Sequence, residues 1–329
     1  MRLAIIKLSA LGDIVHASFL PQIIKKEYPH ITIDWFVEQR FSDILENNPY
    51  IDNIITVNLK DNKNNIAKEI KKIYSYKKND YDIVIDLQGL IKSASIAKIL
   101  GNGCGFDKNS IREKFASFFY KKKFFIPYEE NVILRNYMLT CKCLNFKINI
   151  NNIKDKEKSL FYTNKNLNKI LQHITKNKKN ILLVMGSSWK SKVYPKEKYL
   201  SIIKQIDANF LLSWGSQKEK KDALFISKNS NAILLENMNL NELKALIDSC
   251  DLVIGGDSGP THMAWALNRP SITIFGPTPK DRNTFKTNIN LTVDCEKEIN
   301  PLKLDKKDMC IQNIDENKII KMINRLLYG

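Results

Sequence analysis

The sequence lacks any long uninterrupted apolar run. The first apolar stretch, residues 3–24, is broken by Lys7, Asp13 and His16, and no small-residue cleavage site follows it. An export signal is therefore not expected there. No later segment approaches the roughly 20 uncharged apolar residues that a membrane-spanning helix needs. The pattern excludes an integral membrane protein and predicts a cytoplasmic one.

Cysteine and histidine are few and poorly spaced for metal binding. None of the six cysteines and four histidines shows ligand spacing. Cys141 and Cys143 fall in a predicted helix, where their side chains diverge. We expect reduced thiols, leave a Cys295–Cys310 pair open, and predict no metal site and no required cofactor.

Acidic residues are scarce relative to basic ones. The chain has 52 lysines and arginines against 35 acidic residues, a net charge of +17. Such a balance indicates nucleic acid, an anionic membrane surface or an acidic substrate as partner, or a compositional bias without function. No helix-turn-helix, zinc-finger or RNA-binding signature is present, so nucleic acid is not expected. A G-x-G-x-x-G fingerprint is also missing, which disfavours a nicotinamide dehydrogenase.

The length of 329 residues exceeds what one hydrophobic core usually serves, so two domains are expected. Short β-branched runs alternate with helix-length segments in both halves, which predicts two doubly wound α/β domains with parallel sheets. The predicted strands cover residues 3–8, 31–37, 54–57, 83–87, 181–184, 210–213, 233–235, 252–255 and 271–275. The Asn- and Lys-rich residues 149–166 are the predicted linker. We therefore predict domains over residues 1–160 and 161–313, with a helix at 314–329 that packs back on the N-terminal domain.

The loops that directly follow strands are the first candidates for a ligand site, because ligands bind beyond the carboxyl ends of parallel strands. The segment Gly255–His262 is a glycine-rich turn between a strand and a helix. Its glycines, free amides and helix dipole favour a phosphate, and Ser258 and Thr261 add hydroxyls. An ordinary turn capped by Asp257 or Ser258 explains the same pattern. Both interpretations stay open.

Three further loops have the same position. Met185–Lys192 offers small hydroxyls and two lysines that suit a diphosphate, or it is a solvated basic loop. Glu219, after the strand at 210–213, suits ribose hydroxyls or the first turn of a helix. Asp13, in the loop after the first strand, is either a carboxylate facing a cleft or a helix N-cap.

These loops together resemble those of the lipopolysaccharide heptosyltransferases, in particular the heptosyltransferase I branch. The resemblance implies a GT-B fold, two Rossmann-like domains facing across a cleft, with ADP-heptose held by the C-terminal domain and the acceptor by the N-terminal one. It implies inverting transfer of L-glycero-D-manno-heptose to the Kdo of Kdo-lipid A, in the inner core of lipopolysaccharide. The motifs that carry it are Lys7–His16, Ile85–Lys92, Gly105–Asp107 with Arg112, Lys192, Trp214–Gly215 and Gly256–His262.

The resemblance also implies roles for individual residues. Asp13 corresponds to the general base and Lys192 to the group facing the donor diphosphate. Glu219 corresponds to the ribose contact and Met238 lies beside the adenine. The other implied donor contacts are Ser187, Ser188, Asp257, Ser258, Gly259 and His262, and the acceptor contacts are Lys7, Ser9, Lys60 and Arg112. Lys60 stands where an arginine is typical, which weakens bidentate recognition of a carboxylate there.

Two alternatives remain open at this point. A paralogue such as heptosyltransferase II adds heptose to heptose with the same donor loop, and a non-catalytic nucleotide-sugar-binding protein would keep Gly255–His262 without needing Asp13. Aromatic and basic residues alternate over residues 112–124, which suits an anionic inner-membrane surface on the cytoplasmic side or a partly buried amphipathic helix.

Overall fold

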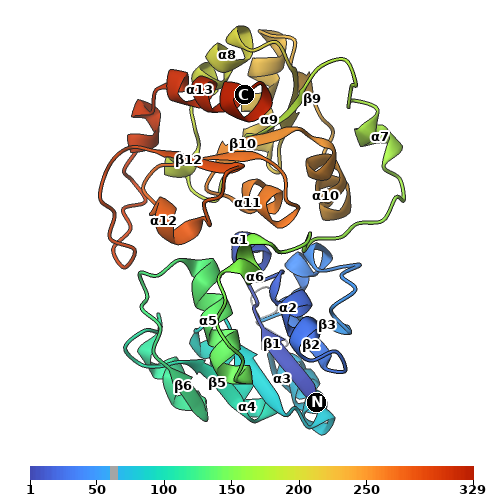
Figure 1. Cartoon of the computed structure of the whole chain (residues 1–329), viewed down its shortest axis with the longest axis vertical. Helices are drawn as coiled ribbons and strands as arrows, with labels where there is room; N and C mark the ends of the chain where they lie inside the picture. Colours follow the sequence, from blue (N-terminus) through green and yellow to red (C-terminus); the bar gives the residue numbers. More distant parts are fainter. Residues whose placement is uncertain (60–65) are drawn as a thin grey trace. The chain divides into compact units, whose positions relative to one another are not determined.

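The computed structural model describes residues 1–59 and 66–329. The chain divides into two compact units, Met1–Phe161 and Tyr162–Gly329 (Figure 1). The division falls one residue beyond the predicted boundary, inside the predicted linker. Each unit holds one parallel six-stranded sheet.

The first unit is a doubly wound sheet in the strand order β3-β2-β1-β4-β5-β6. Every neighbouring pair is parallel, and Ile5 of β1 lies opposite Trp35 on one side and Ile85 on the other, all three buried. Such runs, apolar on both faces, are typical of parallel strands covered by helices. The strands are β1 (Arg2–Ile6), β2 (Thr32–Glu38), β3 (Asn53–Val57), β4 (Ile83–Asp86), β5 (Gly103–Phe106) and β6 (Lys122–Phe124).

Helices cover both faces of this sheet. Phe19 at the start of α2 and Tyr137 of α5 have ring centroids 6.3 Å apart, so these two helices share one face. Right-handed crossovers place α3, α4 and η4 on the other face, where α4 packs against both of its neighbours. The helices are α1 (Leu11–Val15), α2 (Leu20–Glu27), α3 (Ile66–Ser75), α4 (Ile91–Leu100), α5 (Val132–Leu144) and α6 (Asn151–Lys154), with 3₁₀ helices η1 (Gln39–Ile44), η3 (Tyr76–Asn79) and η4 (Lys114–Phe119).

The second unit repeats this topology in the order β12-β11-β10-β7-β8-β9, again with parallel neighbours throughout. Its strands are β7 (Asn180–Val184), β8 (Asn209–Ser213), β9 (Ile233–Leu234), β10 (Leu252–Gly256), β11 (Ser271–Phe275) and β12 (Asn290–Asp294). Its helices are α7 (Asn168–Leu171), α8 (Lys196–Gln205), α9 (Gln217–Lys228), α10 (Leu240–Ser249), α11 (Gly259–Ala266), α12 (Lys280–Asn283) and α13 (Glu316–Leu327), with η5 (Lys190–Lys192) and η6 (Cys310–Asn313).

The C-terminal helix α13 packs on the second unit, so the prediction that it packs on the N-terminal domain is wrong. Ile319 and Ile323 of its apolar stripe are fully buried in the core of the second sheet. The helix lies against α8 and the ends of β10, β11 and β12, and Glu316 pairs with Lys198 of α8 at 3.3 Å. Its apolar stripe covers part of the sheet face in its own unit, and that burial decides its place.

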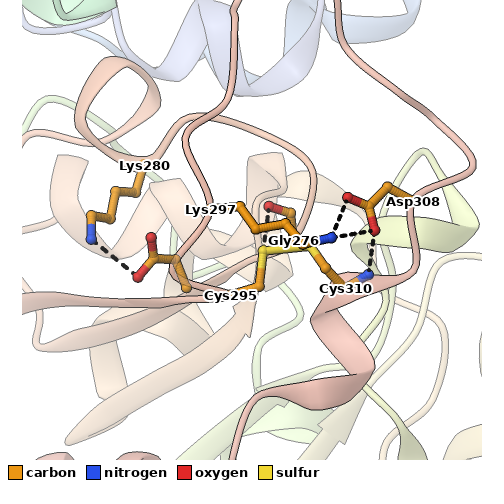
Figure 2. Close-up of a disulfide and its surroundings, with 7 residues drawn as sticks. Gly276, Lys280, Cys295, Lys297, Asp308 and Cys310 are labelled. Atoms are coloured by element: carbon orange, nitrogen blue, oxygen red, sulfur yellow. Dashed lines mark hydrogen bonds and ion pairs between the residues drawn. A yellow bond between two sulfur atoms is a disulfide. The ribbon is translucent and has the colours of Figure 1, made fainter.

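The structure pairs four of the six cysteines, contrary to the expectation of reduced thiols. Strand β5 and helix α5 bring the Cα atoms of Cys104 and Cys143 to 6.2 Å, within the range for a disulfide. The open Cys295–Cys310 pair is also formed (Figure 2), with the Cys295 sulfur beside the Gly276 carbonyl. Cys141 stays unpaired and buried, so the two helical thiols do point apart as predicted.

The strand order of each sheet reverses at one point, between β1 and β4 in the first unit and between β7 and β10 in the second. The connections that follow such neighbouring strands run in opposite directions, so their loops leave room for a ligand at the carboxyl ends. The loops after β1, β4, β7 and β10 flank these two points, and they contain many of the residues predicted to bind donor or acceptor.

Candidate functional site

Asp257 is the centre of a buried polar network at the carboxyl end of β10. Its Oδ2 lies 2.8 Å from the Lys192 ammonium and its Oδ1 lies 2.8 Å from Nε2 of His262. The Thr278 hydroxyl donates to Oδ2 at 2.8 Å, and the Asn283 amide donates to the same oxygen at 3.3 Å. One carboxylate thus joins the loops after β7, β10 and β11.

The electrostatics of this network favour the ionised carboxylate. Burial by itself raises the pKa of Asp257, but the hydrogen bond from His262 and the positive charge of Lys192 outweigh it. The pKa of Asp257 is therefore held well below its usual range. The Asp257 carboxylate compensates the Lys192 charge and holds the ammonium close to the residue that precedes the N-cap of α11.

Two glycines allow the loops to approach so closely. A Cβ on Gly256 would collide with the Lys192 backbone carbonyl. A Cβ on Gly186, directly after β7, would collide with the Glu219 carboxylate. These positions accept no side chain without moving the residues that the sequence analysis assigns to donor binding.

The start of α11 presents the groups that suit an anion. Ser258 is the N-cap residue, and its hydroxyl lies 3.1 Å from that of Thr261. The amides of Gly259 and Thr261 are in the first turn, where no carbonyl within the helix accepts from them. Ser187 donates to the Asp257 carbonyl at 3.1 Å, which ties the loop after β7 to this helix start. Ser258 occupies the N-cap position without a side-chain cap hydrogen bond, and the Asp257 carboxylate bonds to other loops instead of capping the helix. Anion binding at this turn stays a prediction.

Glu219 has the helix-start role and also faces the site. It is the third residue of α9, its amide donates to Ser216 at 3.3 Å, and its Oε2 accepts from the Gly215 amide at 2.7 Å. Its carboxylate covers Gly186. Met238 is half-buried in the segment between β9 and α10, and Ser188 is exposed. The second unit therefore brings Ser187, Lys192 and Glu219 to the carboxyl ends of its central strands near Asp257, and the roles of Ser188 and Met238 stay predictions.

The Trp189 ring lies close to two lysine ammonium groups of this site. It lies 5.0 Å from the Lys192 ammonium and 4.8 Å from that of Lys306. Lys306 belongs to the loop that the Cys295–Cys310 disulfide closes. Cation–π contacts of this kind hold ammonium groups in place without neutralising them.

The first unit places its candidates at the end of β1. The buried Lys7 ammonium donates to the Leu87 carbonyl at 2.8 Å. The Gln88 side chain accepts from the Ser9 amide at 3.2 Å. The loops after β1 and β4 are thereby held together, with Ser9 half-buried.

Asp13 is not the N-cap of α1 but its third residue. Its Oδ2 accepts from the amide of Ala10, the N-cap position, at 3.1 Å. The side chain is half-buried in the first unit. Arg112 is exposed between β5 and η4, and Lys60 lies outside the described residues.

Three polar partners of these groups, Gln88, Thr278 and Asn283, were not predicted from the sequence. Thr278 and Asn283 follow β11, so the rule that ligands gather after strands could have indicated them. Gln88 falls within the motif Ile85–Lys92 but was given no role of its own. Across residues 1–59 and 66–329 no group of three or more metal-ligating side chains was found, and no helix there is long and apolar enough to cross a membrane.

Each unit is a doubly wound parallel sheet, and comparison with known proteins shows which family has this architecture. The family model for glycosyltransferase family 9 (heptosyltransferase) matches residues 70–310, and the chain belongs to this family. Over 99% of both chains it is 45% identical to lipopolysaccharide heptosyltransferase 1 of Campylobacter coli. The protein is thus a glycosyltransferase, and its resemblance is to heptosyltransferase I of lipopolysaccharide synthesis. The alternative of a non-catalytic binder is wrong.

Solved structures confirm the GT-B fold. The E. coli heptosyltransferase WaaC with ADP-2-deoxy-2-fluoro heptose superposes with a TM-score of 0.75 at 21% identity, covering 98% of this chain and 99% of that one. E. coli ADP-heptose lipopolysaccharide heptosyltransferase II gives a TM-score of 0.76 at 18% identity, covering 99% and 98%. The fold alone does not separate the two activities, and the full-length relative from Campylobacter coli does favour the first.

Proposed function

We propose that the protein transfers L-glycero-D-manno-heptose from ADP-heptose to the Kdo of Kdo-lipid A. The observation that carries the donor half is the network in which Asp257 holds Lys192 beside the start of α11. An ammonium, two hydroxyls and free helix amides together suit a diphosphate. The 45% identical relative carries the name of this activity.

In the proposed reaction an acceptor hydroxyl attacks the anomeric carbon of the heptose. Asp13 accepts the hydroxyl proton, the new C–O bond forms, and the bond from the anomeric carbon to the phosphate oxygen breaks. ADP leaves with the electron pair of that bond, and configuration inverts. Lys192 and the amides of Gly259 and Thr261 stabilise the charge that develops on the diphosphate.

The donor's other contacts follow from the positions of the remaining candidates. Glu219 accepts hydrogen bonds from ribose hydroxyls, Met238 lies against the adenine, and Ser187, Ser188, Ser258 and His262 line the phosphate and sugar. His262 acts through Asp257, to which its Nε2 is bonded. We infer that the positive charge of Lys192 and the dipole at the start of α11 take the place of a metal ion, so that activity persists in a chelator.

The proposed acceptor is acidic, which suits the basic chain. Ser9, Arg112 and Lys60 are the proposed acceptor contacts, and Lys7 contributes by fixing the loop after β4 through Leu87. Because Kdo-lipid A is anchored in a bilayer, we infer that the protein works at the cytoplasmic face of the inner membrane. The net charge of +17 supports both inferences.

The decisive experiment supplies ADP-heptose with either Kdo-lipid A or an acceptor that already carries heptose, and weighs the products. A mass gain of one heptose on Kdo-lipid A alone is expected. Product only from the heptosylated acceptor would favour a paralogue of the heptosyltransferase II type.

The base assignment needs its own variant. Asp13→Asn keeps a side-chain oxygen that can accept the hydrogen bond from the Ala10 amide, so the first turn of α1 should stay intact. The carboxylate that acts as the proposed general base is lost. We expect kcat to fall about 10²–10⁴-fold, with the affinity for ADP unchanged. Asp13→Ala removes the bond to Ala10 as well and is expected to be equally inactive. Wild-type turnover in Asp13→Asn would refute the assignment.

A further inference from the structure

One face of the first unit exposes an unusual set of large apolar side chains. Helices α3, α4 and η4 form the layer on this face, and α4 packs against both others. Their exposed apolar residues, which we call the outer apolar face, are Ile66, Ile70, Tyr74, Ile91, Phe115 and Phe118. Within α3, Ile66, Ile70 and Tyr74 recur at every fourth position and so form one stripe.

The most exposed of these side chains lie on η4. Phe115 is 73% exposed and Phe118 is 69% exposed, and their ring centroids lie 6.4 Å apart. Exposing two adjacent phenylalanines to water is unfavourable and marks an interaction surface.

The opposite side of η4 fastens it to the sheet. Ala116 and Ser117 are buried, and the buried Tyr120 hydroxyl donates to Asp86 of β4 at 2.6 Å. The sequence pattern suggested a contribution from Tyr120, Phe119 and Phe124, but Tyr120 belongs to the core and the other two are half-buried. The structure thus keeps Phe115 and Phe118 outward on a rigid base.

Basic side chains surround the outer apolar face. Residues 108–125 contain six lysines and arginines and one acidic residue, Glu113, whose carboxylate accepts from the Ile91 amide. Lys122 and Lys123 of the edge strand β6 and the preceding Lys121 are exposed, and the Lys123 ammonium lies 5.9 Å from the Phe118 ring centroid. Across α3 and η3, residues 66–79, five lysines accompany one glutamate.

We propose that the outer apolar face docks on an anionic lipid bilayer, with Phe115 and Phe118 entering the interface and Lys121–Lys123 facing lipid headgroups. Aromatic rings flanked by lysines bind such surfaces through apolar burial and attraction to anionic headgroups. A second copy of the chain fits poorly, because a symmetric contact would bring the two lysine runs together. The choice of a lipid surface rests on the proposed function. Binding to vesicles can nevertheless be measured without any heptose transfer, so the two proposals can fail separately.

The test measures binding of the full chain to vesicles by co-sedimentation, with phosphatidylcholine alone or with anionic phosphatidylglycerol added. We expect binding only to the anionic vesicles, and weaker binding as salt rises. Replacing Lys121, Lys122 and Lys123 by serine should lower the partition coefficient about 100-fold, since each lysine near the surface contributes about fivefold. Phe115→Ser with Phe118→Ser should lower it at least about tenfold.

Leu302→Ser is the matched control, because Leu302 is 61% exposed but belongs to the second unit. It should bind like the wild type. Equal binding of the Phe115/Phe118 variant and the wild type would overturn the proposal, as would a loss of self-association in that variant with vesicle binding intact. Transfer to a short-chain, water-soluble acceptor should be unchanged in the phenylalanine variant, which separates failure of the docking face from failure of the proposed reaction.

Discussion

Replacing the Asp257 carboxylate by an amide of the same size is the sharpest test of the donor network. In Asp257→Asn the amide would leave the Lys192 ammonium without its counter-charge, and both side chains are about nine-tenths buried. Breaking a buried ion pair on one side costs about 3–5 kcal/mol. We expect a loss of that size in the free energy of unfolding of the second unit.

The assay has to report the second unit alone, because a chain with two units need not unfold in one step. Hydrogen exchange of the β10 amides, measured beside urea unfolding, gives that readout. The matched control is Asp248→Asn, which removes a carboxylate paired at 2.9 Å with the more exposed Arg269 in the same unit. It should lose less stability and keep its affinity for ADP, whereas Asp257→Asn should lose that affinity.

The pH dependence gives an independent check. The pKa of Asp257 is depressed in the folded protein, so its contribution is fully present above the ordinary aspartate value of about 3.9. The stability gap between wild type and Asp257→Asn should be constant from about pH 8 to 5 and narrow as the pH falls below about 4. A gap under about 1 kcal/mol at pH 7, with unchanged β10 exchange, would refute the network as described.

Two further outcomes are expected. Gly186→Ala should displace the Glu219 carboxylate and raise KM for the donor about tenfold, while Gly215→Ala, whose Cβ would meet Glu219 at an ordinary 3.5 Å, should not; steady-state kinetics of both variants decide this. Burial lowers the pKa of Lys156 to about 7, so the unfolded chain binds more protons between about pH 7 and 10.5 and stability should rise there by up to roughly 1.4 kcal/mol per pH unit. Lys156→Met should remove that slope in urea unfolding measured across the range, and equal slopes would contradict the reasoning.

Much of the fold could be predicted from the sequence because most strands are buried on both faces. Runs such as Ile181–Val184 are apolar throughout and begin and end with a β-branched residue, and each of the nine predicted strands overlaps an observed one. The three strands that were missed, β5, β6 and β12, carry weaker signals, and β12 is the edge strand of the second sheet. Strand β5 contains two glycines, and β6, with Lys122 and Lys123, is an edge strand whose side chains face water. Edge strands do not need the apolar pattern that identifies central ones.

The candidate site was predictable only where one loop carries its own signal. Strand-then-glycine patterns indicated the loops after β7 and β10, and those loops do meet. The partners from Thr278 and Asn283 could not be found in this way, because hydrogen bonds between loops depend on which strands are neighbours. The same holds for α13, whose amphipathic pattern showed a buried face but not which sheet buries it.

The strand order explains why one carboxylate can organise the donor site. Strands β11, β10 and β7 are adjacent, so the loops that follow them converge on the residue at the end of the central strand. Asp257 occupies that position and bonds to Lys192 on one side and Thr278 on the other. A buried ion pair adds little net stability compared with apolar packing. We infer that the Asp257–Lys192 ion pair serves to orient the lysine, because it holds the Lys192 ammonium at one place between three loops. An apolar residue in place of Asp257 would leave that ammonium free to move.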